Sequence, residues 1–359
     1  GTVLLYTCLG VYILIASIRL IHSKHGVSLL IAYSILPVIL AVYREVTPTS
    51  GGTDAYTYVR YFETSLDSSM FNIVKTNIFG LRDPVYQYLN ILIRLITDDY
   101  HVFFFVIYSL IVISMFYFVK EVFSLSTVFS PLIFLVYYYL QSYNIIRFMV
   151  AMSFITLGYI QMTKGKRALS VIYCLLGALC HFTTVIVLIA DIAYIMYSNE
   201  RLQRVGWYIF GIVSIYSAIF ILQSRIISMI SESEYIGYIL NRETAFILFA
   251  HITTILCSLL SLLNFKKLIK KNEINTYMVF LVVFDFALIP VGIYLQIFRL
   301  HNMFLLPRLY VWGQLMECNQ ERILREKDFR IICATIMVLW TVFRVIRDAS
   351  GAGYIPYTL

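Results

Sequence analysis

The chain has 359 residues, of which 60% are hydrophobic and only 13% are charged. Apolar runs of about 20 residues recur along its whole length, which excludes a water-soluble enzyme and indicates a polytopic helical membrane protein. The net charge of +8 does not indicate nucleic-acid binding, because the basic residues fall mainly in short turns between apolar segments, where they act as topology signals.

Residues 1–359 are predicted to form one all-helical transmembrane domain with about twelve spans. The expected spans are residues 2–21, 27–45, 101–119, 126–143, 146–163, 168–182, 183–198, 205–222, 244–264, 275–296, 300–317 and 331–347. The first span lacks the basic n-region and cleavage site of a signal peptide, so we expect the mature protein to keep it. The apolar segment 168–197 is too long for one ordinary span, and we expect two short helices that meet near His181.

One segment, residues 46–100, departs from this pattern, since loops of such length are uncommon unless they are functional. It begins with Gly51-Gly52, a glycine-permitted turn that delivers the Asp54 carboxylate to a membrane surface. Pro84 is predicted to open an interfacial or re-entrant helix. We expect this external loop to pack against the bundle, although an ordinary solvated loop is an alternative for two of its charges. The charged candidates in the loop are Asp54, Arg60, Arg82 and Asp83.

Two ionisable residues, Arg147 and His181, are predicted at one edge of the membrane. Arg147 opens one apolar segment and His181 closes the next, with the basic turn Lys164–Arg167 between them. A charge inside a span costs about 2.5–3.5 kcal/mol on insertion scales, so it persists where it faces a polar cavity or has a function. Taken singly, the arginine also fits an interfacial anchor and the histidine a hydrogen-bonded packing residue.

Lysine and arginine are concentrated in alternate turns, and this bias predicts the orientation of the chain. The basic turns are residues 19–26, 120–126, 164–167, 199–204, 265–273 and 318–330. We assign them to the cytoplasm and both termini to the outside. The external face then gathers charges from distant parts of the chain, as a site for an anionic ligand requires. Arginines favour phosphate, because guanidinium groups bind phosphoryl oxygens bidentately and keep their charge.

Short motifs follow one another in a recognisable order along most of the chain. They are Gly52-Thr53-Asp54 with Tyr56 and Tyr61, Asp83-Pro84 with Tyr86, Asn144 to Arg147 with Ala151, Gly177-Ala178 before His181, Arg299 to Leu306, and Ile355-Pro356-Tyr357. With these motifs the chain resembles the bacterial polysaccharide polymerases of the EpsG and Wzy type. Phe182-Thr183 departs from the family pattern, in which a small residue such as serine lies near that place.

The resemblance implies a GT-C-like glycosyltransferase of the bacterial inner membrane with its active site facing the periplasm. Such an enzyme transfers a growing glycan from undecaprenyl pyrophosphate to the non-reducing end of a new lipid-linked repeat unit, releasing undecaprenyl pyrophosphate. The implied partners are lipid-linked glycans, membrane lipids and a chain-length regulator, with no nucleic acid. A lipid-linked oligosaccharide flippase and an O-antigen ligase are the alternatives.

This reaction needs a cation beside the departing pyrophosphate and a group that removes a proton from the attacking sugar hydroxyl. We assign the cationic role to Arg147 and Arg299, with Arg82 as a third candidate, and the proton-accepting role to His181 or Asp54. No cofactor is expected, and no metal, because the acidic candidates show no DxD-like spacing. The further candidates for substrate contact are Arg60, Tyr56, Asp83 and Tyr354.

Overall fold

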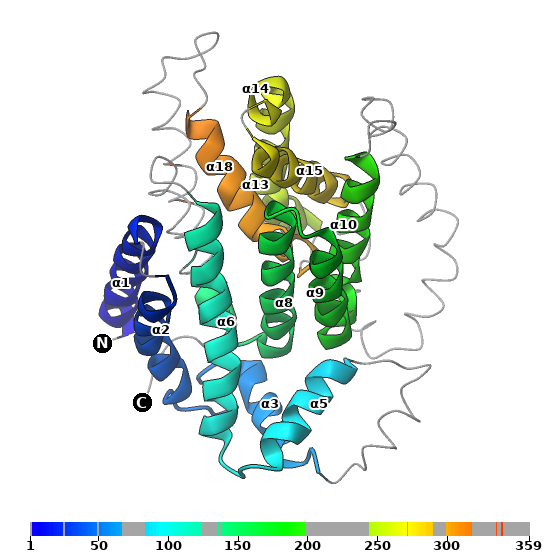
Figure 1. Cartoon of the computed structure of the whole chain (residues 1–359). Helices are drawn as coiled ribbons and strands as arrows, with labels where there is room; N and C mark the ends of the chain where they lie inside the picture. Colours follow the sequence, from blue (N-terminus) through cyan, green and yellow to red (C-terminus); the bar gives the residue numbers. More distant parts are fainter. Residues whose placement is uncertain are drawn as a thin grey trace. The chain divides into compact units, whose positions relative to one another are not determined.

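The structure is a computed structural model of the chain (Figure 1). It describes residues 2–23, 26–48, 50–66, 83–123, 135, 138–198, 244–270, 272–289, 299–317, 335 and 339. Two compact units are present: Gly1–Leu188 with Asn319–Leu359, and Ile189–Cys318. Every regular element within the described ranges is a helix, as the sequence predicts for an all-helical protein.

Three helices among the described residues are long and apolar enough to cross a membrane. They are α1 (Thr2–His22), α6 (Tyr100–Val122) and α8 (Ile146–Thr163), and each coincides with a predicted span. Helix α2 (Gly26–Val42) is equally apolar but shorter, and it contains Pro37. The chain is therefore a helical membrane protein, while the count of twelve spans stays a prediction.

The predicted break near His181 is confirmed. Helix α9 (Arg167–Cys180) ends just before this residue, and α10 (Val185–Tyr197) begins after a single 3₁₀ turn, η2 (Phe182–Thr184). At 1.5 Å per residue α9 is only about 21 Å long, shorter than the roughly 30 Å of a bilayer core. His181 itself has an extended backbone, so its side chain lies at a helix end rather than inside a span.

Three other predicted spans lie wholly or largely outside the described residues, namely 126–143, 205–222 and 331–347. Helix α13 (Thr244–Leu263) matches its predicted span, and α15 (Glu273–Ala287) covers the first part of another. The predicted span 300–317 is divided, because a turn at Met303 and Phe304 separates α17 (Arg299–Asn302) from α18 (Leu305–Glu317).

Close packing of α8 on α9 brings the start of α8 and the end of α9 together in the first unit. A Cβ at Gly158 would press on Cys174 and Ser170 of α9, and one at Gly177 would press on Ile155 and the Ala151 carbonyl of α8. Small residues at such contacts let two helix backbones approach closely. The two helices run antiparallel after the turn at Gly165, so the start of α8 and the end of α9 are neighbours.

The loop predicted at residues 46–100 contains two helices, α3 (Thr53–Glu63) and α5 (Pro84–Arg94), and Pro84 opens the second as predicted. Both pack against α6, and in addition α3 contacts α8 and α5 contacts α9. Figure 1 shows them together at one end of these longer helices. The loop therefore covers the end at which α8 begins and α9 finishes.

The opposite end of the first unit carries basic residues. Lys164 Nζ lies 2.7 Å from Glu121 Oε2 and donates to the Tyr117 hydroxyl at 2.9 Å. Lys120 is adjacent and lies against Gly26 at the start of α2. Three turns predicted to share one side of the membrane thus share one end of this unit, and the helices of the loop lie at the other end.

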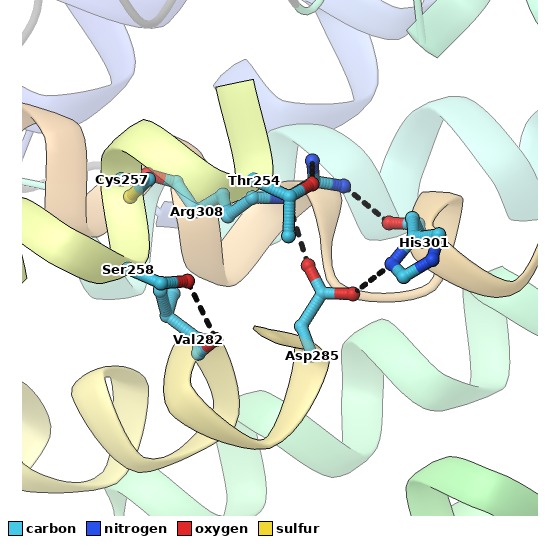
Figure 2. Close-up of polar contacts among 7 residues, drawn as sticks. All are labelled: Thr254, Cys257, Ser258, Val282, Asp285, His301 and Arg308. Carbon is cyan, nitrogen blue, oxygen red and sulfur yellow. Dashed lines mark hydrogen bonds and ion pairs between the residues drawn. The ribbon is translucent and has the colours of Figure 1, made fainter. Parts of the chain in front are cut away.

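The second unit is built around a buried charge cluster (Figure 2). Asp285 of α15 lies 2.5 Å from His301 Nδ1 through Oδ1 and 3.2 Å from Arg308 Nε through Oδ2. Arg308 also donates to the Thr254 hydroxyl and to the carbonyl of His301. These contacts join α13, α15, α17 and α18. Because the Asp285 side chain is 0% exposed, its charge depends on these partners.

We expect Asp285→Asn to lower the free energy of unfolding by about 3–5 kcal/mol, because it leaves the Arg308 guanidinium buried without its counter-charge. Thermal unfolding of the purified chain in detergent measures the change. Ser258→Ala is the matched control. Ser258 lies on α13 and donates one hydrogen bond to the Val282 carbonyl of α15, so its loss should cost only about 1 kcal/mol. Equal thermal shifts for the two variants would contradict the expectation.

Candidate functional site

Three ionisable side chains of the first unit form the candidate site: Asp83, Arg147 and His181. Asp83 Oδ2 lies 2.8 Å from Arg147 Nη1, and its Oδ1 lies 3.9 Å from His181 Nδ1. Oδ1 also accepts a hydrogen bond from the backbone N–H of Phe182 at 3.0 Å. The start of α5, the start of α8 and the link between α9 and α10 therefore meet at one carboxylate.

The three side chains differ in their access to the surface. Asp83 is 5% exposed and His181 12%, whereas Arg147 retains 25% of its side-chain surface. A buried carboxylate requires a charged or hydrogen-bonding partner, and here the guanidinium and an amide supply both. Arg147 is the member of the group that a ligand could reach most readily.

Asp83 has an unusual backbone for a non-glycine residue, with φ 63° and ψ 55° in the left-handed region. Such a conformation costs about 1–3 kcal/mol and persists where the surroundings fix it. An aspartate that precedes a helix commonly caps it, yet this side chain makes no capping hydrogen bond to α5. Instead the carboxylate is turned toward Arg147 and Phe182, so its contacts with other segments determine its position.

The first turn of α8 carries Arg147 and also contacts His181, which follows the end of α9. Arg147 is its second residue, and the next residue, Phe148, meets the His181 ring edge to face with the centroids 5.5 Å apart. The extended backbone of His181, with φ −154° and ψ 107°, directs the chain from α9 into η2 at this point. Arg147 and His181 thus lie close together at one end of α8 and α9, as predicted, and Asp83 joins them there, while their place at the membrane edge stays a prediction.

The other predicted residues of α3 lie nearby in sequence but make different contacts. The backbone N–H of Asp54 donates to Asn144 Oδ1 at 2.7 Å, which ties the start of α3 to the segment that precedes Arg147. Arg60 Nη1 donates to the Tyr56 hydroxyl at 3.3 Å on the exposed side of the same helix. Arg60 and Tyr56 thus form a pair of their own on α3.

Three predicted residues cannot be placed with the site. Arg82 and Tyr354 lie outside the described residues. Arg299 opens α17 in the second unit, but its side chain is likewise outside the described part of the chain. Their assigned roles remain predictions.

Arg44, which the sequence analysis did not single out, organises the backbone behind the site. Its side chain is buried just after α2 and donates from Nε to the Gly51 carbonyl at 2.7 Å, from Nη2 to the Tyr108 hydroxyl at 2.7 Å, and from Nη1 to the Ala41 carbonyl. The guanidinium carbon also lies 4.5–4.9 Å from the ring centroids of Phe104, Tyr108 and Tyr143. Arg44 therefore connects α2, the Gly51-Gly52 turn, α6 and the segment before α8.

Tyr86 is a further buried residue of the loop, on α5 just after Asp83. Its side chain is 2% exposed and meets Tyr58 of α3 edge to face at 6.1 Å. Burial, reinforced by Tyr58, raises the pKa of the Tyr86 hydroxyl well above its usual value, and Asn90 and the nearby Arg147 charge offset only part of this. The hydroxyl stays protonated at neutral pH and remains a hydrogen-bond donor.

A guanidinium, an imidazole and a carboxylate in contact can bind an anionic group and move a proton. In the parts of the chain that the structure describes, no three His, Cys, Asp or Glu side chains are grouped as metal ligands. The chemistry that Asp83, Arg147 and His181 themselves offer is charge stabilisation and proton transfer.

We expect Arg44→Lys to lower the free energy of unfolding by about 3 kcal/mol, because one ammonium cannot reach the Gly51, Ala41 and Tyr108 oxygens together. Thermal unfolding in detergent tests this. Arg19→Lys, at an exposed position near the end of α1, should leave the transition unchanged. If Arg44→Lys and Arg19→Lys unfold at similar temperatures, the several donors of the Arg44 guanidinium are not required for stability.

Gly52 is expected to tolerate no side chain. It has φ 100°, and a Cβ there would overlap the Tyr143 carbonyl, so Gly52→Ala should destabilise the chain by more than about 2 kcal/mol. Gly165→Ala is the matched control: its φ is 72°, but no atom lies within 4 Å of the added Cβ, and only about 1 kcal/mol is expected. If the two variants lose the same free energy of unfolding, the close approach of Gly52 to the Tyr143 carbonyl does not contribute to the destabilisation.

Comparison with known protein families shows that residues 29–359 match the model of the EpsG family. No curated protein and no solved structure matches the chain. The matched region includes α3, α5, α8 and α9, and hence every residue of the candidate site. The resemblance inferred from the short motifs is confirmed, and the chain belongs to the EpsG family.

Proposed function

We propose that the chain is the glycosyltransferase that joins undecaprenyl-pyrophosphate-linked oligosaccharide repeat units at the periplasmic face of the bacterial inner membrane. Membership of the EpsG family implies a polysaccharide-polymerase type of function, and the apolar helices make the chain a membrane protein. To this family-level function the proposal adds three points: the donor is linked to a lipid pyrophosphate, undecaprenyl pyrophosphate is released, and the reaction takes place on the periplasmic side of the membrane.

The contact of Arg147 with Asp83 beside His181 carries this proposal. In the reaction a sugar hydroxyl attacks the anomeric carbon of the donor while the bond to the pyrophosphate oxygen breaks. Negative charge develops on the leaving group, and a proton leaves the hydroxyl. A fixed cation beside the leaving group and a proton acceptor beside the hydroxyl are the groups that lower this barrier.

Arg147 is the proposed cation, because its guanidinium keeps its charge at all relevant pH values and part of its surface is accessible. His181 and Asp83 are the ionisable groups beside it, and Asp54 lies in the first turn of the neighbouring helix α3. We propose that Tyr56 and Arg60, paired on the exposed side of α3, contact sugar rings. The remaining candidates for substrate contact are Arg82, Arg299 and Tyr354.

The distribution of lysine and arginine supports the proposed orientation. Lys120 and Lys164 lie at the end of the first unit opposite the candidate site. Basic residues that flank spans are enriched on the cytoplasmic side. The site would then face the periplasm, where lipid-linked repeat units are polymerised. Membrane lipids and a chain-length regulator protein are the proposed partners, and no cofactor is required.

Arg147→Ala and His181→Ala are each expected to lower polymer yield at least a hundredfold and to leave single repeat units on the lipid carrier. The measurement is the length distribution of surface polysaccharide in a strain deleted for this gene and complemented with each variant. Membrane insertion is checked in parallel. Arg167→Gln, at the opposite end of α8 and α9, and His22→Gln, exposed at the end of α1, are matched controls that should restore the full ladder.

The accumulated intermediate separates the proposal from its alternatives. A polymerase defect leaves single repeat units on the outer face. Units trapped inside would instead identify a flippase, and long chains retained on undecaprenyl pyrophosphate would identify an O-antigen ligase. If both alanine variants restore the full ladder, Arg147 and His181 have no catalytic role and serve only as an anchor and a packing residue.

A further inference from the structure

The groups around Asp83 are those that would bind a phosphate. Its Oδ2 pairs with the Arg147 guanidinium, while its Oδ1 accepts the Phe182 N–H and lies 3.9 Å from the His181 ring. Guanidinium, amide and imidazole donors bind phosphoryl oxygens as readily as carboxylate oxygens. In this structure the Asp83 carboxylate is the anion that these donors surround.

The donors and the carboxylate come from separate segments, so they can part. Arg147, Phe182 and His181 belong to α8 and to the link after α9, which pack closely together. Asp83 belongs to the loop and precedes α5. Its left-handed backbone is held by the contacts of its side chain, and losing those contacts would let the strain relax. Because α5 itself packs against α9, the movement would be confined to Asp83 ahead of the helix, and the donors would stay in place.

We propose that Asp83 is a built-in counter-ion that the pyrophosphate of the donor displaces from Arg147, and that the released carboxylate then accepts the proton of the acceptor hydroxyl. This inference rests on the proposed function, in which Arg147 binds the pyrophosphate. A pyrophosphate diester carries two negative charges and a carboxylate carries one. The donor therefore has the stronger attraction to the same guanidinium.

Displacement also decides which group takes the proton. A carboxylate paired with an arginine and an amide N–H is a weak proton acceptor, and it becomes a better one when those partners are removed. His181 would then lie beside the bound pyrophosphate, whose charge favours the protonated imidazole, so the ring serves as a donor to the phosphate. Asp83 remains as the acceptor, in place of His181 or Asp54.

The step is balanced without a further reactant. The acceptor oxygen forms a bond to the anomeric carbon, and the bond from that carbon to the pyrophosphate oxygen breaks with its electron pair on the leaving group. The hydroxyl proton moves to the Asp83 carboxylate. After undecaprenyl pyrophosphate leaves, Asp83 gives the proton to water and pairs with Arg147 again.

Binding of inorganic pyrophosphate to the full chain in lipid nanodiscs tests the displacement. Asp83→Asn keeps the size of the side chain but removes the charge that competes for Arg147, so we expect it to bind pyrophosphate about tenfold more tightly than wild type. Asp83→Ser is a second charge-free variant with the same expectation. A residue that merely binds substrate or stabilises the fold would give weaker binding when changed.

The control is Asp98→Asn, which removes another carboxylate paired with an arginine in the same unit, at an exposed position near the end of α5. Its pyrophosphate affinity should equal that of wild type. Arg147→Ala should weaken binding at least tenfold, and the double variant with Asp83→Asn should bind no better than Arg147→Ala. This dependence on Arg147 would show that the two residues act through one contact.

Polymerisation of lipid-linked repeat units by the same preparations tests the proton transfer. Asp83→Asn should lose activity at least a hundredfold in spite of its tighter binding, whereas Asp83→Glu, which keeps a carboxylate, should retain part of it. Unchanged or weaker pyrophosphate binding by both charge-free variants overturns the displacement. Wild-type turnover by Asp83→Asn overturns the proton-accepting role.

The same measurements separate this inference from the proposed function. If Arg147→Ala binds pyrophosphate as tightly as wild type, the assignment of Arg147 in the proposed function fails, and the inference fails with it. If Arg147→Ala loses binding but the charge-free Asp83 variants do not gain it, the proposed function stands and only the counter-ion role is wrong.

Discussion

The ion pair between Asp83 and Arg147 is the contact on which the arrangement of the first unit depends. An arginine at the edge of apolar helices needs a partner, and the loop supplies one from the start of α5. Because Asp83 also accepts the Phe182 N–H, the same carboxylate fixes the link between α9 and α10. The buried Asp83 carboxylate thus connects the start of α5, the start of α8 and the link between α9 and α10, which are distant in sequence.

Buried arginines elsewhere in the chain meet the same requirement in other ways. Arg44 has carbonyl and hydroxyl oxygens and the faces of aromatic rings as partners, and Arg308 in the second unit shares Asp285 with His301. Arg44 as a whole residue is 1% exposed and the Arg308 side chain 6%, whereas Arg147 keeps 25% of its side-chain surface. This difference in access is why the proposed ligand contact is assigned to Arg147, whereas the other two arginines hold helices together.

Apolar runs predicted the spans that became α1, α6 and α8, because the length of such a run follows directly from the thickness of a bilayer. The excess length of residues 168–197 predicted the break at His181 for the same reason. The contact between Asp83 and Arg147 could not be predicted, since no local rule pairs residues 64 positions apart. Arg44 was missed because an arginine at the end of a span has the pattern of an interfacial anchor, and its enclosing rings lie far along the chain.

The placement of the counter-ion on the loop has a physical consequence for how a membrane enzyme can hold an exposed cation. An arginine kept without a partner beside apolar helices would be costly and would attract any anion, including lipid head groups. A carboxylate on the same rigid helices would satisfy the charge but would also exclude the substrate. A carboxylate on a separate segment with a strained backbone satisfies the charge at rest, and in the proposed mechanism it gives way to a doubly charged ligand. The left-handed turn at Asp83 is therefore as important to the site as the charges that it brings together.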